Sequence, residues 1–149
     1  MKFRTGGQTG VDRALLDFCL ENQLEAGGWC PEGRKAEDGK IPDHYPLVEL
    51  QDAGYDERTE ANVLESDATL ILHLGEITGG TKLTVSCCAK FCKPSLLLDL
   101  RDENLWVQLE LFFPSLPRSR EAWRSPAPSQ LFFFSSQGAP CSDPEMIAQ

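Results

Sequence analysis

The chain has 149 residues, of which 41% are hydrophobic and 25% charged, values that are ordinary for one globular domain. No apolar run approaches the ~20 residues of a membrane helix, and the first residues lack the apolar stretch of a signal peptide. The sequence therefore predicts a cytoplasmic protein with no membrane segment. The net charge of −9 argues against a broad nucleic-acid surface, because neutralising phosphates takes clustered Lys and Arg.

The body of the chain alternates between extended and helical patterns. Apolar spacing predicts, in chain order, a strand at 2–5, a helix at 11–23, an extended piece at 27–31, a loop at 32–54, a helix at 55–66, a strand at 68–74, a helix at 81–92, a strand at 95–100 and a helix at 103–113. Strand, turn and helix repeated in this order are typical of an α/β fold. We expect a Rossmann-like three-layer architecture with a mostly parallel sheet and an irregular C-terminal end.

Residues 114–149 differ in composition from the rest. They hold six of the ten prolines and seven serines and carry no net charge, whereas residues 1–113 carry all of the net −9. We therefore divide the chain into a ligand-binding domain at 1–113 and an atypical Pro/Ser-rich tail at 114–149, either disordered or altered. Within the tail, the apolar run at 131–134 (LFFF) is compatible with a short strand.

Two glycine-containing turns precede predicted helices. TGGQTG occupies residues 5–10, and TGGT occupies residues 78–81. In parallel α/β sheets, such turns at the carboxyl ends of strands expose backbone N–H groups and the positive end of a helix dipole to an anion. Glycine lets the backbone approach the ligand closely, and the threonines add hydroxyl donors. Neither turn is a Walker loop or GxGxxG, and a tight connection without a ligand stays open as the alternative.

Ordered short motifs over about residues 3–100 carry a family resemblance. They lie at 6–14 (GGQTGVDRA), 27–31 (GGWCP), 33–39 (GRKAEDG), 41–47, 55–63, 66–70 (SDATL), 78–81 (TGGT) and 93–100. In these motifs the chain resembles the molybdenum cofactor carrier proteins of bacteria and algae, part of a Rossmann-like nucleotide-binding superfamily. That superfamily also includes DNA-processing protein A and lysine-decarboxylase-like phosphoribohydrolases. The resemblance implies a homo-oligomer that stores or transfers molybdenum cofactor, a molybdopterin-based phosphorylated pterin, with a molybdoenzyme or a cofactor-synthesis protein as its partner.

The predicted ligand-binding residues come from both turns and from one helix between them. They are Gly6, Gly7, Gln8, Thr9, Gly10, Arg13, Arg58, Asn62, Thr78, Gly79, Gly80 and Thr81. Arg58 and Asn62 lie at i and i+4 and share a helix face. For Arg13, pairing with a phosphate and a solvated helix position stay open. For Glu37 and Asp38, a polar ligand rim and a solvated loop stay open.

Four other residues have plainer interpretations. Asp12 is explained by the dipole of the helix it opens, and His73 by burial in an apolar strand. Trp29 is expected to pack in the core or a loop rather than to stack on a pterin. Cys30 has the soft thiolate that suits molybdenum, but an inert buried thiol is the expected state. Without CxxC pairs or histidines at ligand spacing, we expect no metal site in the chain itself.

A nucleotide-processing enzyme of the phosphoribohydrolase type, acting on a nucleoside monophosphate or an ADP-ribose-like ligand, is the alternative function. The phosphoribohydrolase relatives carry a glutamate shortly after their glycine–threonine turn. Here the residues at 82–86 are KLTVS and include no acid. This absence favours a carrier or binding protein over an enzyme.

Overall fold

The computed structural model describes residues 2–115 and 130–135. In these residues the helices are α1 (Val11–Glu21), α2 (Tyr55–Glu65), α3 (Gly79–Lys90) and α4 (Leu105–Ser115), with a 3₁₀ turn at Glu32–Arg34. The strands are β1 (Lys2–Arg4), β2 (Ala26–Gly27), β3 (Trp29–Pro31), β4 (Lys35–Ala36), β5 (Gly39–Lys40), β6 (Val48–Leu50), β7 (Ala68–His73), β8 (Ser95–Asp99) and β9 (Gln130–Ser135). None of the helices described here has the length and apolar character that crossing a bilayer requires.

A five-stranded sheet with the order β2-β1-β9-β7-β8 forms the centre of the fold. Its neighbouring strands all pair in parallel, so their carboxyl ends lie at one edge. β9 lies between β1 and β7, with Phe3 opposite Leu131 and Ala68 also opposite Leu131. The apolar run near the C-terminal end therefore forms a central strand of the same sheet as the body.

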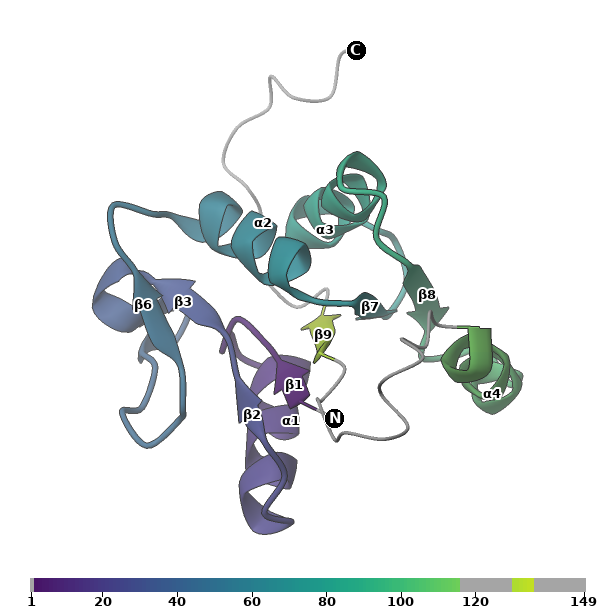
Figure 1. Ribbon diagram of the computed structural model, residues 1–149, viewed down its shortest axis with the longest axis horizontal. Coiled ribbons are helices and arrows are strands. Elements are labelled where there is room, and N and C mark those ends of the chain that lie inside the picture. The colour runs from purple at the N-terminus through teal and green to yellow at the C-terminus, as the bar shows by residue number, and fades with distance from the viewer. Residues whose placement is uncertain (1, 116–129, 136–149) are drawn as a thin grey trace, which may run out of the picture.

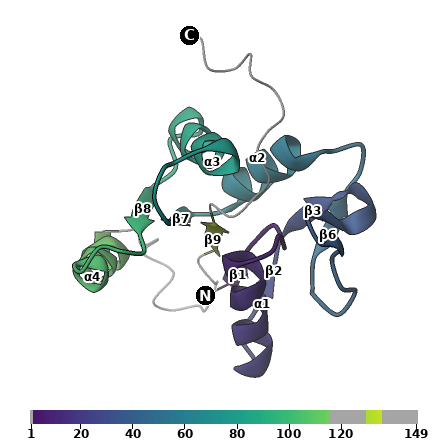
Figure 2. The same ribbon diagram turned by 180° about the vertical axis from the view of Figure 1, so that it is seen from behind.

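Helices cover both faces of the sheet. In both views α2 and α3 lie on one face, and α1 and α4 lie on the other (Figures 1 and 2). Val63 of α2, Ile71 of β7, and Cys87 and Cys88 of α3 form a buried cluster between the first pair of helices and the sheet. These alternating helices and strands make the three-layer α/β fold that the sequence predicts.

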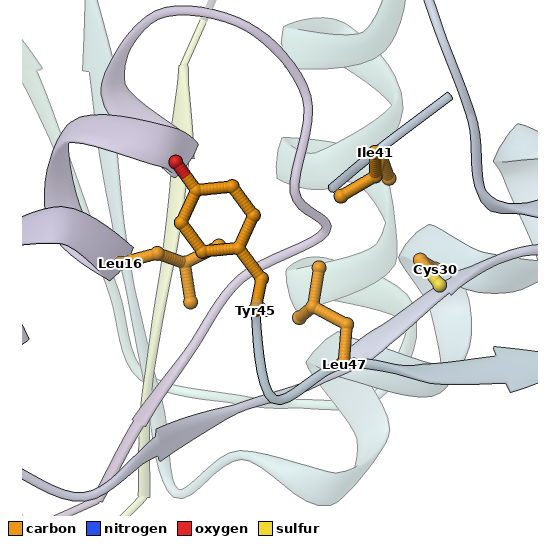
Figure 3. Close-up of a cluster of buried hydrophobic side chains, with 5 residues drawn as sticks. All are labelled: Leu16, Cys30, Ile41, Tyr45 and Leu47. Atoms are coloured by element: carbon orange, nitrogen blue, oxygen red, sulfur yellow. The ribbon is translucent and has the colours of Figure 1, made fainter. Parts of the chain in front are cut away.

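A second buried cluster lies away from the centre of the sheet. It joins Leu16 of α1 and Cys30 of β3 to Ile41, Tyr45 and Leu47 (Figure 3). The last three residues belong to the segment between β5 and β6, which has little regular structure of its own. The cluster therefore fastens this segment to α1 and β3 by burying its apolar side chains.

Arg34 fixes the same segment from within. Its guanidinium is buried and donates hydrogen bonds to four backbone carbonyls, those of Ile41, Pro42, Tyr45 and Leu47, at 2.9–3.1 Å. A buried arginine thus replaces the regular backbone pairing that the loop lacks. The donors of Arg34 are thus taken up by the protein backbone.

The structure confirms the predicted fold class and most of the predicted elements. The segment at 32–54 differs, because it contains the short strands β4, β5 and β6 rather than a plain loop. The third helix begins two residues earlier than predicted, at Gly79, so the second glycine turn is partly helical. The interpretation of the tail concerns residues that lie mostly outside the described ranges, and a division at residue 113 stays a prediction.

Candidate functional site

The two glycine turns lie at the same edge of the sheet. The first follows β1 and leads into α1, and the second follows β7 and leads into α3. β1 and β7 flank β9, so the two turns are separated by roughly 10 Å, twice the spacing of neighbouring strands. The chain leaves β1 towards β2 on one side and leaves β7 towards β8 on the other. This reversal is the place where open parallel sheets bind their ligands.

The first turn is shaped by its glycines. A Cβ on Gly6 would lie 1.5 Å from Nη1 of Arg58, so only glycine lets the guanidinium lie against the backbone here. Gly7 has a φ of +75° and packs on the second cluster, where a Cβ would lie 2.3 Å from Cδ1 of Leu47. Gly10 opens α1 with a φ of 82°. Gly6 therefore faces the arginine, whereas Gly7 fits the turn to the core.

Arg58 is the most unusual residue at this edge. Only 2% of its surface is exposed, yet Nε and Nη1 are enclosed without a hydrogen-bond partner among the described residues. Burial lowers the pKa of Arg58, while the negative charge of Asp12 opposes that change. At any pH a protein meets, the guanidinium keeps its charge. The turn thus holds a buried cation with two unused N–H donors.

Asp12 lies beside this cation and is also buried. Its Oδ2 accepts a hydrogen bond from the backbone N–H of Gln8 at 3.1 Å, and Oδ1 is enclosed without a partner. Burial raises the pKa of Asp12 and outweighs the attraction of Arg58 and the hydrogen bonds that the carboxyl accepts. The interpretation by the helix dipole stays compatible with this position, since Asp12 lies in the first turn of α1, and the structure adds that the carboxyl is enclosed beside the charge of Arg58.

The β4–β5 hairpin is fastened to the first turn by polar side chains. Arg13 binds the carboxylate of Asp38 with both terminal nitrogens, one of them at 2.7 Å. The hydroxyl of Thr9 donates to Glu37 at 3.0 Å, and Nε2 of Gln8 donates to the carbonyl of Lys35 at 3.2 Å. Arg13, Thr9 and Gln8, three of the predicted binding residues, therefore hold the hairpin in this structure.

Asn62 uses its whole amide on the backbone. Oδ1 accepts a hydrogen bond from the N–H of Trp29, and Nδ2 donates to the carbonyl of the same residue, both at 2.9 Å. These bonds tie α2 to β3 and thereby hold Arg58, one turn earlier in α2, against Gly6. The indole Nε1 of Trp29 is enclosed without a partner among the described residues.

The second turn is the N-terminus of α3. Thr78 is the N-cap residue with extended backbone and no side-chain capping bond, and Gly79 follows with a φ of 47°. The carbonyl of Thr78 accepts the N–H of Thr81 at 3.1 Å. Thr81 is completely buried, and its hydroxyl has no hydrogen-bond partner in the part of the chain that the structure describes. Both turns thus contain an enclosed polar group that the protein leaves unused.

The candidate metal ligands are held in the interior. Cys30 is fully buried, its thiol donates to the carbonyl of Val48 at 3.5 Å, and burial raises its pKa. His73 is nearly buried, with Nδ1 2.9 Å from the carbonyl of Gly75. Within residues 2–115 and 130–135, no three His, Cys, Asp or Glu side chains gather in a way that would hold a metal ion.

Sequence reasoning selected Arg58 but missed what surrounds it. Asp12 was judged from its place at the start of a helix, and nothing in one sequence shows that a carboxyl there is enclosed. The motif GVDRA, which places an acid directly after a glycine turn, was the available signal. Glu37 and Asp38 were considered as a rim, and the structure adds that they bind Thr9 and Arg13.

Comparison with known proteins agrees with this architecture. Residues 3–112 match the family described as the circularly permutated YpsA SLOG family. A solved structure from Syntrophus aciditrophicus SB, named "Putative molybdenum carrier protein", is 37% identical, covers 90% of this chain and 80% of its own, and superposes with a TM-score of 0.75. The comparison with curated proteins finds no match. The family match spans most of the chain and includes both glycine turns, α2 and the buried arginine, and the chain therefore belongs to the circularly permutated YpsA SLOG family.

Proposed function

We propose that the chain is a carrier that binds a small phosphorylated ligand at the shared edge of β1 and β7, and that this ligand is molybdenum cofactor. The observation that carries the proposal is Arg58, a buried cation whose Nε and Nη1 have no acceptor among the described residues. Taking a charge out of water costs several kcal/mol unless an opposite charge and hydrogen bonds offset it. An anionic ligand oxygen would supply both.

The surroundings of Arg58 favour a phosphate group as that anion. Gly6 lies directly against the guanidinium, and the N-termini of α1 and α3 begin at the same edge. Backbone N–H groups at helix N-termini bind phosphate oxygens, and a planar guanidinium binds them with paired donors. The unused hydroxyl of Thr81 adds a donor from the second turn. A phosphate on the pterin therefore fits the donors that the two turns offer.

The name of the solved relative supports the carried ligand. The thiol of Cys30 is enclosed, so we assign the phosphate end of the cofactor to this edge and no ligand role to Cys30. A cysteine binds a soft metal as the deprotonated thiolate, and burial raises the pKa of Cys30, which favours the protonated thiol. We also propose, on the family resemblance, that a homo-oligomer in the cytoplasm passes the cofactor to a molybdoenzyme or a cofactor-synthesis protein.

The twelve predicted residues divide by role in this proposal. Arg58, Gly6, Thr81 and the backbone of Thr78, Gly79 and Gly80 contact the ligand, and so does Gln8 once its side chain leaves the carbonyl of Lys35. Gly7, Gly10 and Asn62 position the contacting residues. Thr9 and Arg13 bind the ligand after they release the hairpin, whose acids occupy their donors in this structure.

The experiment is thermal unfolding of the purified chain with molybdenum cofactor, AMP or ADP-ribose at matched concentration. A ligand that binds only the folded state stabilises it by roughly 2.7 kcal/mol at about 100 times its Kd. We expect a shift with the cofactor that disappears in Arg58→Met. Lys90→Met, which removes one exposed positive charge from the far end of α3, is the matched control and should keep the shift.

Arg58→Lys covers the case in which Arg58→Met does not fold, because lysine keeps the charge and loses only the paired donors. We expect it to retain part of the shift. An unchanged shift in a folded Arg58 variant would overturn the proposed site. A shift with the nucleotides alone, together with release of free base or ribose phosphate, would favour the phosphoribohydrolase alternative.

A further inference from the structure

We propose that Asp12 makes the site selective for an oxyanion that carries a proton, such as hydrogen phosphate or a singly protonated phosphate monoester. The inference rests on the proposed function, because it requires an anion at Arg58. It adds Asp12 as a residue that determines specificity, and the ligand's proton as the property that is selected. Backbone N–H groups and guanidinium donors bind any oxyanion of suitable size. A carboxylate beside them repels an oxyanion oxygen that carries no proton.

The unused polar atoms around Gly6 are of two kinds. Arg58 offers two donors, Nε and Nη1, and Asp12 offers one acceptor, Oδ1. Both side chains adjoin the first turn, since Nη1 of Arg58 lies where the Cβ of Gly6 would be and the Asp12 carboxyl accepts the N–H of Gln8. The two charges attract each other, yet Oδ1 and Nη1 are each left without a hydrogen bond. A ligand that both accepts and donates hydrogen bonds would satisfy all three atoms.

A phosphate group has this combination and several other tetrahedral anions lack it. Inorganic hydrogen phosphate keeps a P–OH donor throughout the neutral range, whereas a phosphate monoester, whose last proton has a pKa of about 6, carries one mainly below neutral pH. Sulfate and molybdate are fully deprotonated there. A carboxylate oxygen and a deprotonated oxyanion oxygen repel each other, and the low dielectric of a buried site strengthens that repulsion. One hydrogen must therefore lie between Oδ1 of Asp12 and the ligand.

Among the described residues, the titratable and charged groups that act on this pair come from α2 and β3. Arg58 of α2 faces Asp12, and Cys30 of β3 with Tyr55 and Asp56 of α2 face Arg58. Arg58 is positive at all relevant pH values, and burial keeps the Cys30 thiol neutral. When hydrogen phosphate binds, it brings the hydrogen. When sulfate binds, Asp12 takes a proton from solvent. Burial raises the pKa of Asp12 and thereby favours this protonation, which still becomes less favourable as the pH rises.

The test compares four tetrahedral oxyanions on the purified chain at equal ionic strength: inorganic phosphate, arsenate, sulfate and molybdate. Calorimetry between about pH 6 and pH 8 should give affinities for phosphate and arsenate at least about tenfold above those for sulfate and molybdate at the upper end. The sulfate affinity should fall about tenfold per pH unit above the pKa of Asp12, because one proton is taken up with the anion. Equal affinities for all four anions would overturn the selectivity and leave the anion site standing. If none of the four binds, the proposed function falls with it.

Asp12→Asn tests the residue itself, because it keeps the shape and replaces the carboxylate by a neutral amide. This variant should bind sulfate about as tightly as phosphate, with no dependence of the sulfate affinity on pH. Glu21→Gln, an exposed change at the other end of α1, should behave like the parent chain. A preference for phosphate that persists in Asp12→Asn would overturn the assignment. The four-anion comparison on the parent chain needs no variant and decides the question even where Asp12→Asn does not fold.

Discussion

Two buried arginines of this chain use their side chains in opposite ways. Arg34 and Arg58 have exposed fractions of 7% and 2%. Arg34 donates to four backbone carbonyls of the segment between β5 and β6. Arg58 leaves Nε and Nη1 without acceptors. Because an unsatisfied buried donor is costly, the second arginine is the one that the proposed ligand would stabilise.

Replacing Arg34 tests the structural half of this contrast. Arg34→Met would leave several buried carbonyls without donors, and each such loss costs about 1–3 kcal/mol. We expect the free energy of unfolding to fall by about 3 kcal/mol or more, measured by urea denaturation. Lys35→Met, an exposed change at the next residue, is the control and should have little effect. A similarly small effect of Arg34→Met would show that the segment does not depend on these bonds.

The sequence identifies the charged residues of the site more readily than their surroundings. Arg58 could be selected because it shares a helix face with Asn62 inside a motif. That its donors are unused, and that Asp12 is enclosed beside it, depends on the packing of β1, α1 and α2 against one another. Burial of this kind arises from contacts between residues far apart in the sequence, such as Asp12 and Arg58, and a local sequence pattern does not reveal it.

At the scale of elements, the β4–β5 hairpin is bound to the first glycine turn through the pairs Thr9–Glu37 and Arg13–Asp38, which we call the clasp. The hairpin acids Glu37 and Asp38 accept hydrogen bonds from Thr9 and Arg13, two residues that we propose as contacts of the ligand anion. Exposed ion pairs are weak and are screened by salt, so the clasp is held lightly compared with the buried cluster behind it. We therefore expect the hairpin to leave the turn more readily than the segment between β5 and β6 leaves its cluster.

Asp38→Asn tests the clasp, because it removes the ion pair and keeps the shape. We expect phosphate to associate faster, observed by stopped-flow fluorescence of the tryptophans. The guanidinium of Arg13 lowers the pKa of Asp38, so the clasp is complete above the ordinary carboxyl pKa and weakens as pH falls through the lowered value. The parent chain should approach the variant only in acid. Asp52→Asn, an exposed change with the same loss of charge, should leave the rate unchanged; an equal acceleration there would contradict the clasp.

Elements that a local sequence pattern specifies could be predicted, whereas elements that depend on contacts with distant residues could not. The helices α1 and α3 could be predicted because a glycine turn precedes an apolar pattern of helical spacing. β7 and β8 could be predicted from continuous apolar runs. The strands β4, β5 and β6 could not, because they are two or three residues long and depend on Arg34 and the second cluster. Their sequence contains no strand pattern long enough to recognise.

At the scale of the whole molecule, β9 joins the two halves of the sheet. On one side of it lie β2 and β1 with the first glycine turn, and on the other lie β7 and β8 with the second. Without β9 each half would be a two-stranded ribbon, which is marginal in water. The strand near the C-terminal end therefore decides whether the two turns share an edge, and its place in the middle of the sheet could not be derived from the order of elements.

Phe133→Pro tests this role of β9 against Phe133→Val as its matched control. Both changes remove the ring, but only proline removes a backbone N–H from β9 at the residue that lies opposite Leu70 of β7. An unpaired buried carbonyl on the neighbouring strand costs about 1–3 kcal/mol, and the strand distortion adds to it. We expect the proline variant to melt about 5–10 °C below the valine variant and to lose the stabilisation by ligand at the same time. Both losses follow from one cause, because separating β1 from β7 separates Arg58 and the first turn from the second. A proline variant that melts with the valine variant and still responds to the ligand would mean that the halves hold together without β9.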